Sequence, residues 1–324
     1  VEKMLGKTGI GLVQTALGES AYEKGGDRFR VLSYLTKAQS QCQNNGIVEM
    51  AWVDTALQAK LALATGDLDY AERLVEGTLR GIPPDSAPQL VDSIRAFGCW
   101  LKLYRNETEA IGQWLAQAPD ETVEFCTLNR YLYMVKIYCY IALGKHTDAL
   151  VLLQRMLAYA DYAQRTYFRM ECGVLNAIVL RRKGSPWKQA FLQLLGRIGE
   201  YHFVPILSEK GAAVLPLLTE VKSCFCAETP AQREWFAQVL EETEHMARLY
   251  PNYLKGTGID ISAFSDTALE VLRLQAAGRS TNEIAQQLHI SPRTVKYHAS
   301  ENYRKLQAKN MVDAVQIARS LNIL

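Results

Sequence analysis

The chain has 324 residues, a net charge of +2 and 48% hydrophobic residues. This length exceeds the usual size of one hydrophobic core, so two domains are expected. The seven cysteines are odd in number and scattered, which argues against the disulfide framework of a small secreted protein. The sequence contains no apolar run of the roughly 18 residues that a membrane span needs. We therefore expect a cytoplasmic protein with no membrane contact.

The segment Gly6-Lys7-Thr8 matches the end of a phosphate-binding loop. Such a loop requires another glycine five residues before Gly6 and a strand before that glycine. Val1 occupies the position, so we expect the chain to bind neither ATP nor GTP and to use no cofactor. Because the chain begins with Val rather than Met, we interpret it either as the C-terminal part of a longer protein or as a trimmed form.

Turn segments recur through the first two hundred residues, at a spacing of 39 or 40 residues. They begin at Gly26, Gly66, Arg105, Gly144 and Gly184, and the small or apolar residues that follow them are Val31, Ala71, Ala110, Ala149 and Ala190. Amphipathic helical patterns lie between the turns, for example over 48–64, 129–143 and 170–180. The period predicts five helical hairpins.

Units of this kind resemble tetratricopeptide-type repeats, in which helix pairs stack because one pair cannot bury its own apolar face. The period is longer than the usual 34 residues and is similar to that of the repeats in MalT-like regulators. The resemblance implies a right-handed solenoid over residues 1–222 that acts as a sensor or interaction domain. It also implies a small-molecule inducer or a protein partner in the groove. The N-terminal NTPase domain that often precedes such repeats is lacking in this chain.

Aromatic residues are frequent in the repeat region, among them Trp52, Trp100, Tyr104, Tyr159 and Tyr162. We interpret them as packing between repeats with their polar tips at the edge, in preference to lining an inducer site.

The cysteine pair Cys224 and Cys226 has no histidine or second pair nearby, so we predict packing rather than a zinc site. The five histidines show no metal-ligand spacing, and no Ser or Cys lies in a nucleophile-elbow sequence. We expect neither a metal site nor an enzyme.

An amphipathic helical pattern over 229–250 is broken by Pro251, Gly256 and Gly258. Residues 223–263 are therefore predicted to be a connecting helix and a hinge. The hinge is either a simple connector or a joint through which the first domain exposes or covers the last one.

Residues 264–324 have the pattern of a helix-turn-helix module. Gly278 suits the end of a first helix, and Ser280 with Glu283 forms a capping box for a short second helix. Ser291 and Pro292 suit the start of a third helix, which extends to about Leu306. Residues 262–324 contain eight Lys or Arg against five Asp or Glu. This net charge of +3 favours binding to DNA phosphates only modestly.

The third helix divides into two faces. Val295, Ala299 and Leu306 fall on a packing face, and the opposite face carries Arg293, Lys296, Tyr297, Ser300 and Arg304. A recognition helix needs this division, because side chains from one face read base edges in the major groove. Any small helical domain can also have an amphipathic third helix, so the pattern alone does not establish DNA binding.

Colinear segments of this module, including Ala277-Gly-Arg-Ser280, Asn282-Glu-Ile-Ala285 and Thr294-Val-Lys-Tyr-His298, resemble the LuxR-type DNA-binding domain. The resemblance implies that Lys296, Tyr297 and Ser300 face bases. It also implies that Thr294, His298 and Lys305 lie near phosphates. Arg304 is also expected to bind DNA. Double-stranded promoter DNA is then the partner, and a dimer on DNA is compatible with the resemblance.

Five positions depart from the family pattern, namely Thr267, Ala268, Glu301, Asn302 and Gln307, and two of these departures have physical weight. Asn302 stands where the packed face usually has Ile, and a buried amide without partners costs about 1 to 3 kcal/mol. Glu301 brings a negative charge near the DNA-facing side, where it is either solvated or accepts a hydrogen bond from a cytosine amino group.

The sequence thus predicts an all-α protein, a tetratricopeptide-like solenoid followed by a small four-helix LuxR-type domain. The predicted function is transcription regulation, in which the repeats sense a small molecule or protein partner. The alternative is a protein interaction scaffold whose degenerate helix-turn-helix no longer binds DNA.

Overall fold

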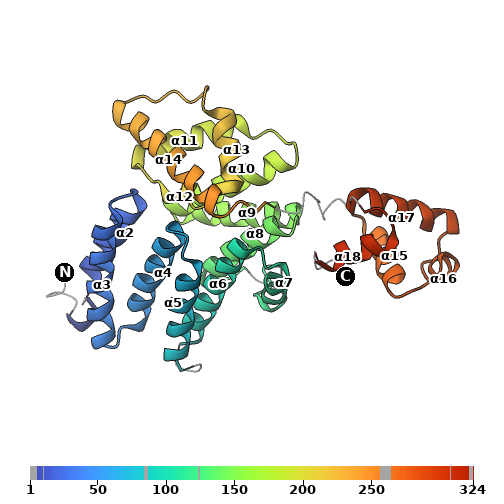
Figure 1. Ribbon diagram of the computed structural model, residues 1–324, viewed down its shortest axis with the longest axis horizontal. Helices are drawn as coiled ribbons and strands as arrows, with labels where there is room; N and C mark the ends of the chain where they lie inside the picture. The colour runs from blue at the N-terminus through green and yellow to red at the C-terminus, as the bar shows by residue number, and fades with distance from the viewer. Residues whose placement is uncertain are drawn as a thin grey trace.

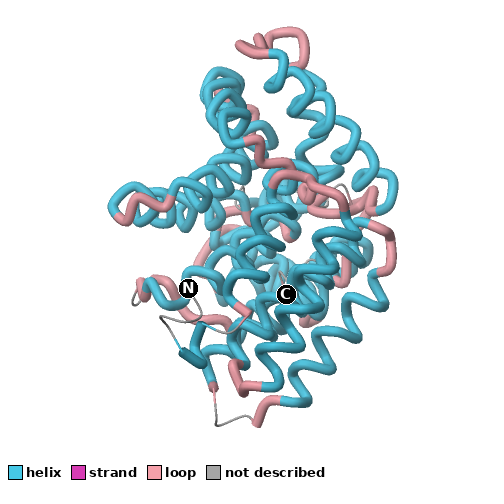
Figure 2. Tube along the Cα trace, turned by 90° about the vertical axis from the view of Figure 1, so that its left-hand side faces the viewer, coloured by secondary structure: helices cyan, strands magenta, loops and turns pink. Residues whose placement is uncertain are grey.

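The computed structural model describes residues 6–9, 11–83, 87–122, 125–255, 264–306, 308–320 and 324. Within these ranges every regular element is a helix (Figures 1 and 2), which confirms the predicted all-α class. None of the described helices combines the length and the hydropathy that crossing a membrane requires.

The first part of the chain contains helices up to α14. Their bounds are η1 Gly6–Gly9, α2 Leu12–Glu23, α3 Arg28–Asn44, α4 Val48–Ala64, α5 Leu68–Gly81, α6 Pro88–Arg105, α7 Thr108–Gln117, η2 Thr127–Asn129, α8 Arg130–Ala142, α9 His146–Tyr162, α10 Thr166–Arg182, α11 Lys188–Tyr201, α12 Pro205–Ser208, α13 Gly211–Val221 and α14 Pro230–Leu249. The last part contains α15 Asp266–Ala276, α16 Thr281–Gln287, α17 Pro292–Leu306 and α18 Met311–Ser320.

Helices α2 to α11 pair into five successive hairpins within the described ranges, α2/α3 to α10/α11 (Figure 1). The chain reverses at a residue with left-handed backbone in each of them, Gly25, Gly66, Asn106, Gly144 and Gly184, with φ between 58° and 86°. Glycine and asparagine adopt this conformation most readily, because other side chains crowd the following carbonyl. The hairpins occur where the periodic turns predicted them.

One buried position follows each turn, near the start of the second helix of the hairpin. It is the fourth residue after the N-cap in every case: Val31, Ala71, Ile111, Ala149 and Phe191, all 1% exposed or less. Two small residues of the repeat pattern, Ala110 and Ala190, lie one residue earlier and are not buried. The helix start, rather than the residue count from the glycine, determines which side chain faces the core, because the face turns by 100° per residue.

The hydrophobic core of the repeat region continues beyond residue 222. Trp235, Phe236 and Val239 of α14 lie in the same cluster as the buried residues of α4 to α13. Tyr253 and Leu254 after α14 are also buried in it, each 1% exposed. The predicted boundary at residue 222 therefore does not coincide with a boundary of this core.

Helix α12 contacts α2, and α14 with the residues after it is hydrogen-bonded to the turn regions of the first hairpins (Figure 1). The Gln238 side chain donates a hydrogen bond to the Gly25 carbonyl (2.9 Å), and the Tyr250 hydroxyl donates to the Leu63 carbonyl (3.0 Å). Arg182 of α10 donates to the Leu254 carbonyl. These bonds join segments far apart in the sequence, so the region from α2 to Leu254 is one packed module. Of the predicted hinge, 256–263 lies outside the described residues.

Most of the aromatic residues pack between helices as predicted, but Trp100 and Tyr104 do not have their polar tips at the edge, since these donate to the Tyr253 hydroxyl (3.1 Å) and the Glu209 carbonyl (3.0 Å) inside the module. Trp52, Phe97, Trp100 and Tyr104 form a chain of ring contacts with centroids 5.0 to 5.4 Å apart, and Tyr104 stacks on Tyr253 at 3.9 Å. Tyr162 is an exception, because it is 91% exposed.

The interpretation of Cys224 and Cys226 as packing residues is wrong, since both are exposed. They follow α13 in a loop, and the lack of further metal ligands nearby, on which the prediction rested, does not determine burial. No group of residues that could hold a metal ion occurs in the described part of the chain.

Candidate nucleic-acid interface

Helices α15 to α18 form a small domain with apolar clusters of its own. One cluster joins Phe264, Leu272, Leu306, Ala314 and Ala318, and the other joins Val271, Leu274, Ile284, Ala285, Val295 and Ala299. Tyr303 packs against both, and its hydroxyl accepts a hydrogen bond from Gln275 (2.9 Å). The predicted four-helix module is confirmed, with α17 held between α15, α16 and α18.

The start of α16 has the predicted capping box. The Ser280 side chain accepts from the Glu283 backbone N–H (3.4 Å), and the Glu283 carboxylate accepts from the Ser280 backbone N–H (2.8 Å). This second bond holds the pKa of Glu283 below its usual value. Gly278 after α15 has a φ of 78°, the left-handed conformation expected at the end of that helix.

The turn between α16 and α17 sets the direction of α17. His289 adopts a left-handed backbone with a φ of 53°, and the Ile290 N–H donates to the Ala285 carbonyl (3.0 Å). The Ser291 hydroxyl then accepts from the Thr294 N–H (3.1 Å), and Pro292 is the first residue of α17. These local bonds confirm the predicted turn and helix start.

Two faces of α17 are distinct in the structure as predicted. Val295, Ala299 and Leu306 are buried in the apolar clusters. The side chains on the opposite face are exposed, namely Arg293, Lys296, Tyr297, Ser300 and Arg304. Their spacing of three and four residues places them along one stripe of the helix. Tyr297 is 63% exposed, which is high for a tyrosine in a small domain and leaves its ring free to contact a ligand.

The residues expected near phosphates lie at the edges of this stripe. Thr294 and His298 are half-buried, and the His298 ring lies 5.6 Å from that of Tyr297. Lys305 is also half-buried, and its ammonium group lies 5.3 Å above the Phe264 ring. A cation over an aromatic face is attracted to it. Lys305 is therefore held at the side of the domain rather than at the centre of the stripe.

Arg304 has a partner within its own helix. Its guanidinium donates to both carboxylate oxygens of Glu301, at 3.1 and 2.8 Å, and this contact lowers the pKa of Glu301. The simple solvation that was one alternative for Glu301 is thus replaced by an ion pair on the surface. Arg304 would have to leave Glu301, or share it, to bind a phosphate.

Asn302 is fully buried, at 0% exposure. Its amide nitrogen donates to the Ala268 carbonyl (2.7 Å), so the residue joins α17 to α15. The amide oxygen has no hydrogen-bond partner among the described residues. This one hydrogen bond thus offsets only part of the desolvation cost of the buried amide.

Arg293 belongs with the predicted site residues, although the resemblance gave it no role. It is exposed in the first turn of α17 and has no ion-pair or hydrogen-bond partner among the described residues. Lys296 likewise has no ion-pair or hydrogen-bond partner in the described part of the chain. Helical spacing already placed Arg293 on the exposed face, and its position directly after Pro292 is a second signal, since the first turn of a helix entering a groove lies nearest the DNA.

A model of bacterial regulatory proteins, luxR family, matches residues 262–318. The chain is similar to Transcriptional regulatory protein DesR of Bacillus subtilis (strain 168), with 30% identity over 96 residues, or 29% of this chain and 47% of that protein. It is 42% identical over 64 residues to Putative HTH-type transcriptional regulator YhjB of Escherichia coli (strain K12), covering 20% and 30% of the two chains. It is 45% identical over 49 residues to Uncharacterized transcriptional regulatory protein YvfU of Bacillus subtilis (strain 168), covering 15% and 24%. No solved structure is significantly similar to the chain.

The aligned segments span less than half the length of each of these relatives. The family match lies on α15 to α18, where the capped helices, the tight turn and the exposed stripe of α17 occur together. The C-terminal module is therefore a helix-turn-helix domain of the luxR family of bacterial regulatory proteins.

Proposed function

We propose that this protein is a DNA-binding transcription regulator in which α17 contacts promoter DNA. The observation that carries the proposal is the exposed stripe of Arg293, Lys296, Tyr297 and Ser300 on a helix whose opposite face is buried. A helix of this kind fits the major groove, where cationic and polar side chains reach base edges. The curated relatives, which bear the names of transcriptional regulators, support the same function.

The test is a DNA selection with the full chain, followed by titration of the selected duplex and of a random duplex. A chain that binds DNA through α17 should recover a preferred sequence. An inverted repeat among the recovered sequences would identify a dimer on DNA, because half-site symmetry mirrors that of the protein. The variant Tyr297→Ala should weaken binding to the selected duplex, whereas Tyr162→Ala, which removes an even more exposed tyrosine of the repeat module, should leave it unchanged.

The second candidate is an interaction scaffold that no longer binds DNA. The ion pair between Glu301 and Arg304 favours it, since the pair reduces the positive charge at one end of the stripe. The same selection separates the two, because a scaffold would recover no preferred sequence. For a DNA-binding chain, Glu301→Gln should release Arg304 and tighten non-specific binding.

We also propose that the packed module from α2 to Leu254 is the sensing part of the protein. The support is a cavity lined by charged and aromatic side chains, among them Lys60, Glu171 and Trp100. A purely structural spacer would not need such a cavity. The ligand would then bias the chain between states that differ in affinity for DNA.

A further inference from the structure

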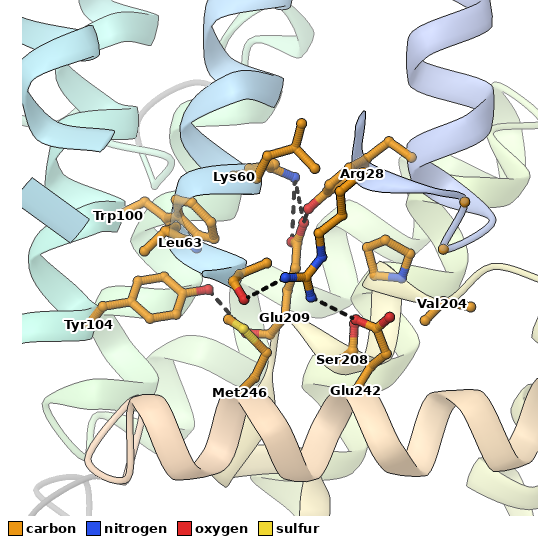
Figure 3. A pocket seen from close by; sticks show the side chains of 16 residues that line it. Arg28, Lys60, Leu63, Trp100, Tyr104, Val204, Ser208, Glu209, Glu242 and Met246 are labelled. Atoms are coloured by element: carbon orange, nitrogen blue, oxygen red, sulfur yellow. Dashed lines mark hydrogen bonds and ion pairs between the residues drawn. The ribbon is translucent and has the colours of Figure 1, made fainter. Parts of the chain in front are cut away.

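A buried cluster of charges lies where the first hairpins meet α12 and α13. Lys60 of α4 pairs with Glu209 (3.0 Å), and Lys210 pairs with Glu171 of α10 (3.1 Å). Hydroxyl groups complete the cluster, since Tyr22 donates to Glu209 (2.6 Å) and Tyr138 donates to Glu171 (2.8 Å). Figure 3 shows Lys60 and Glu209 pointing toward one another from different elements.

The charges of this cluster are held in their ionised forms. Burial acts to lower the pKa of Lys60, but Glu209 and the other nearby carboxylates raise it above its usual value. Burial acts to raise the pKa of Glu171, but Lys210 and Lys60 hold it below its usual value. Two ion pairs are therefore maintained inside the module.

A buried ion pair is a poor way to stabilise a fold. Its desolvation offsets most of the attraction between the charges, and apolar residues of the same size often stabilise as well or better. The contacts between α12 to α14 and the hairpins already include Trp100, Tyr104 and Tyr253. The ion pairs are thus better explained by the cavities beside them than by the stability of the fold.

Cavities lie on two sides of the pair Lys60–Glu209. The smaller one, of about 40 Å³, is shown in Figure 3 and has room for little more than water. The larger one, of about 250 Å³, opens between α6, α8 and α10. Its walls are aromatic, with Trp100, Tyr131 and Phe168, and its charged lining includes Lys60, Glu171 and Arg130. This mixture of flat apolar walls and few charges is typical of small-molecule sites.

The charge of Arg130 indicates which ligand charge the larger cavity favours. The carboxylates that line the larger cavity, Glu171 and Glu209, are matched by Lys210 and Lys60. Arg130 is exposed at the start of α8 and has no ion-pair partner among the described residues, apart from a weak hydrogen bond to the Thr127 carbonyl (3.5 Å). One cation is therefore left over at the opening, and guanidinium groups bind carboxylates in a two-bonded geometry.

We propose that the larger cavity binds a small aromatic carboxylate. The ring lies among Tyr131, Phe168 and Trp100, and the carboxylate meets Arg130. This inference deepens the sensing role proposed above for the module. It predicts a clear order of affinity among molecules that share a ring and differ only in charge.

The test uses phenylacetate, phenylacetamide and 2-phenylethylamine, which carry charges of about −1, 0 and +1 at neutral pH. Ligand-observed saturation-transfer NMR with the full chain, in the absence of DNA, measures their dissociation constants. We expect phenylacetate to bind at least tenfold more tightly than the amide and the amine. Because DNA is absent, the result is independent of whether the protein binds promoter DNA.

Matched variants identify the site. Arg130→Gln should weaken phenylacetate at least tenfold and leave the amide unchanged, and Arg130→Lys should restore part of the affinity. Arg30→Gln, which removes an exposed arginine of α3, is the control and should change nothing. Phe168→Leu should weaken phenylacetate and phenylacetamide alike. Thermal unfolding of each variant checks that the module stays folded.

Two outcomes would overturn the proposal. One is the absence of phenylacetate binding at millimolar concentration. The other is binding of all three molecules with equal affinity, or with no dependence on Arg130, which would show that the cavity selects apolar surface and not an anion.

Discussion

Lys296 and Lys305 lie on the same helix in different surroundings. Lys296 is exposed in the middle of the stripe on α17 and has no partner among the described residues. Lys305 is half-buried near the end of the helix, with its ammonium over the Phe264 ring. We therefore propose that the first contacts a base edge and that the second, held at the side, contacts a phosphate.

The substitution Lys296→Ala should weaken binding to the selected DNA site by about 1 to 3 kcal/mol. It should also relax the sequence preference at one base pair, as expected when a direct contact with a base is lost. Lys305→Ala should weaken selected and random DNA alike, and it should reduce the salt dependence by about one unit because one counterion fewer is released. Titrations of both variants at several salt concentrations measure these effects. An equal loss on both DNAs for Lys296→Ala would contradict its assignment as a base reader.

Asp54 is a buried carboxyl in the repeat module. Its side chain is 0% exposed, and neither oxygen has a hydrogen-bond partner among the described residues. Burial raises the pKa of Asp54 to about 6, above the value of about 3.9 in an unfolded chain. The folded state therefore holds this proton more tightly than the unfolded state. The stability that the group contributes is complete below about pH 3.9 and is lost as the pH rises through about 6.

Replacement of Asp54 by Asn should stabilise the module at pH 8, by about 1 to 3 kcal/mol, because the ionised carboxylate is removed from an apolar site. The gain should shrink as the pH falls and vanish near pH 4. Thermal or denaturant unfolding of the two proteins between pH 4 and pH 8 gives the difference. A gain that does not depend on pH would mean that packing, and not the charge, is responsible.

At the scale of single elements, α16 depends on its first turn. It has only seven residues, so it is too short to be stable alone, and the capping box satisfies backbone groups at its start. Ser280→Ala should destabilise the C-terminal domain by about 0.5 to 2 kcal/mol. Hydrogen exchange of residues 281–288 reports this opening directly. Asn282→Ala, on the exposed side of the same helix, is the control and should not increase exchange.

The limits of the hairpins show what local signals can and cannot specify. The pattern over 48–64 gives the bounds of α4, and α10 extends four residues before the predicted Met170 and two beyond Leu180. The repeat pattern contains Ala110 and Ala190, whereas the buried residues are Ile111 and Phe191. A count from the turn cannot detect that α7 and α11 start later after their turns than the other helices do, because the turn residues themselves do not face the core.

On the scale of the whole molecule, the two modules have separate cores. No buried residue of the described ranges belongs to both the repeat cluster and the C-terminal clusters. The sequence between them contains Gly256 and Gly258, which favour a hinge. Limited trypsin digestion should therefore cut first after Lys255 and release a folded C-terminal fragment. Earlier cleavage within α14 would show that this helix does not belong to the packed module.

The sequence by itself determined the all-α class, the hairpin positions and the helix-turn-helix with its caps and exposed stripe. The caps and turns of the helix-turn-helix rest on residues within one or two turns of each other, where Gly, Pro and Ser act directly on the backbone. The hairpin positions rest on a turn that recurs every 39 or 40 residues. The exposed face of α17 followed from helical spacing alone, although the DNA contacts of its residues stay predictions.

Only the tertiary structure decided the rest. It joined α14 to the repeat core, gave Asn302 the Ala268 carbonyl as a partner, and placed Lys60, Glu171 and Arg130 around one cavity. Those residues come from helices up to 111 positions apart in the sequence, from Lys60 to Glu171. No local pattern records such contacts, because they exist only after the hairpins stack and bring distant faces together.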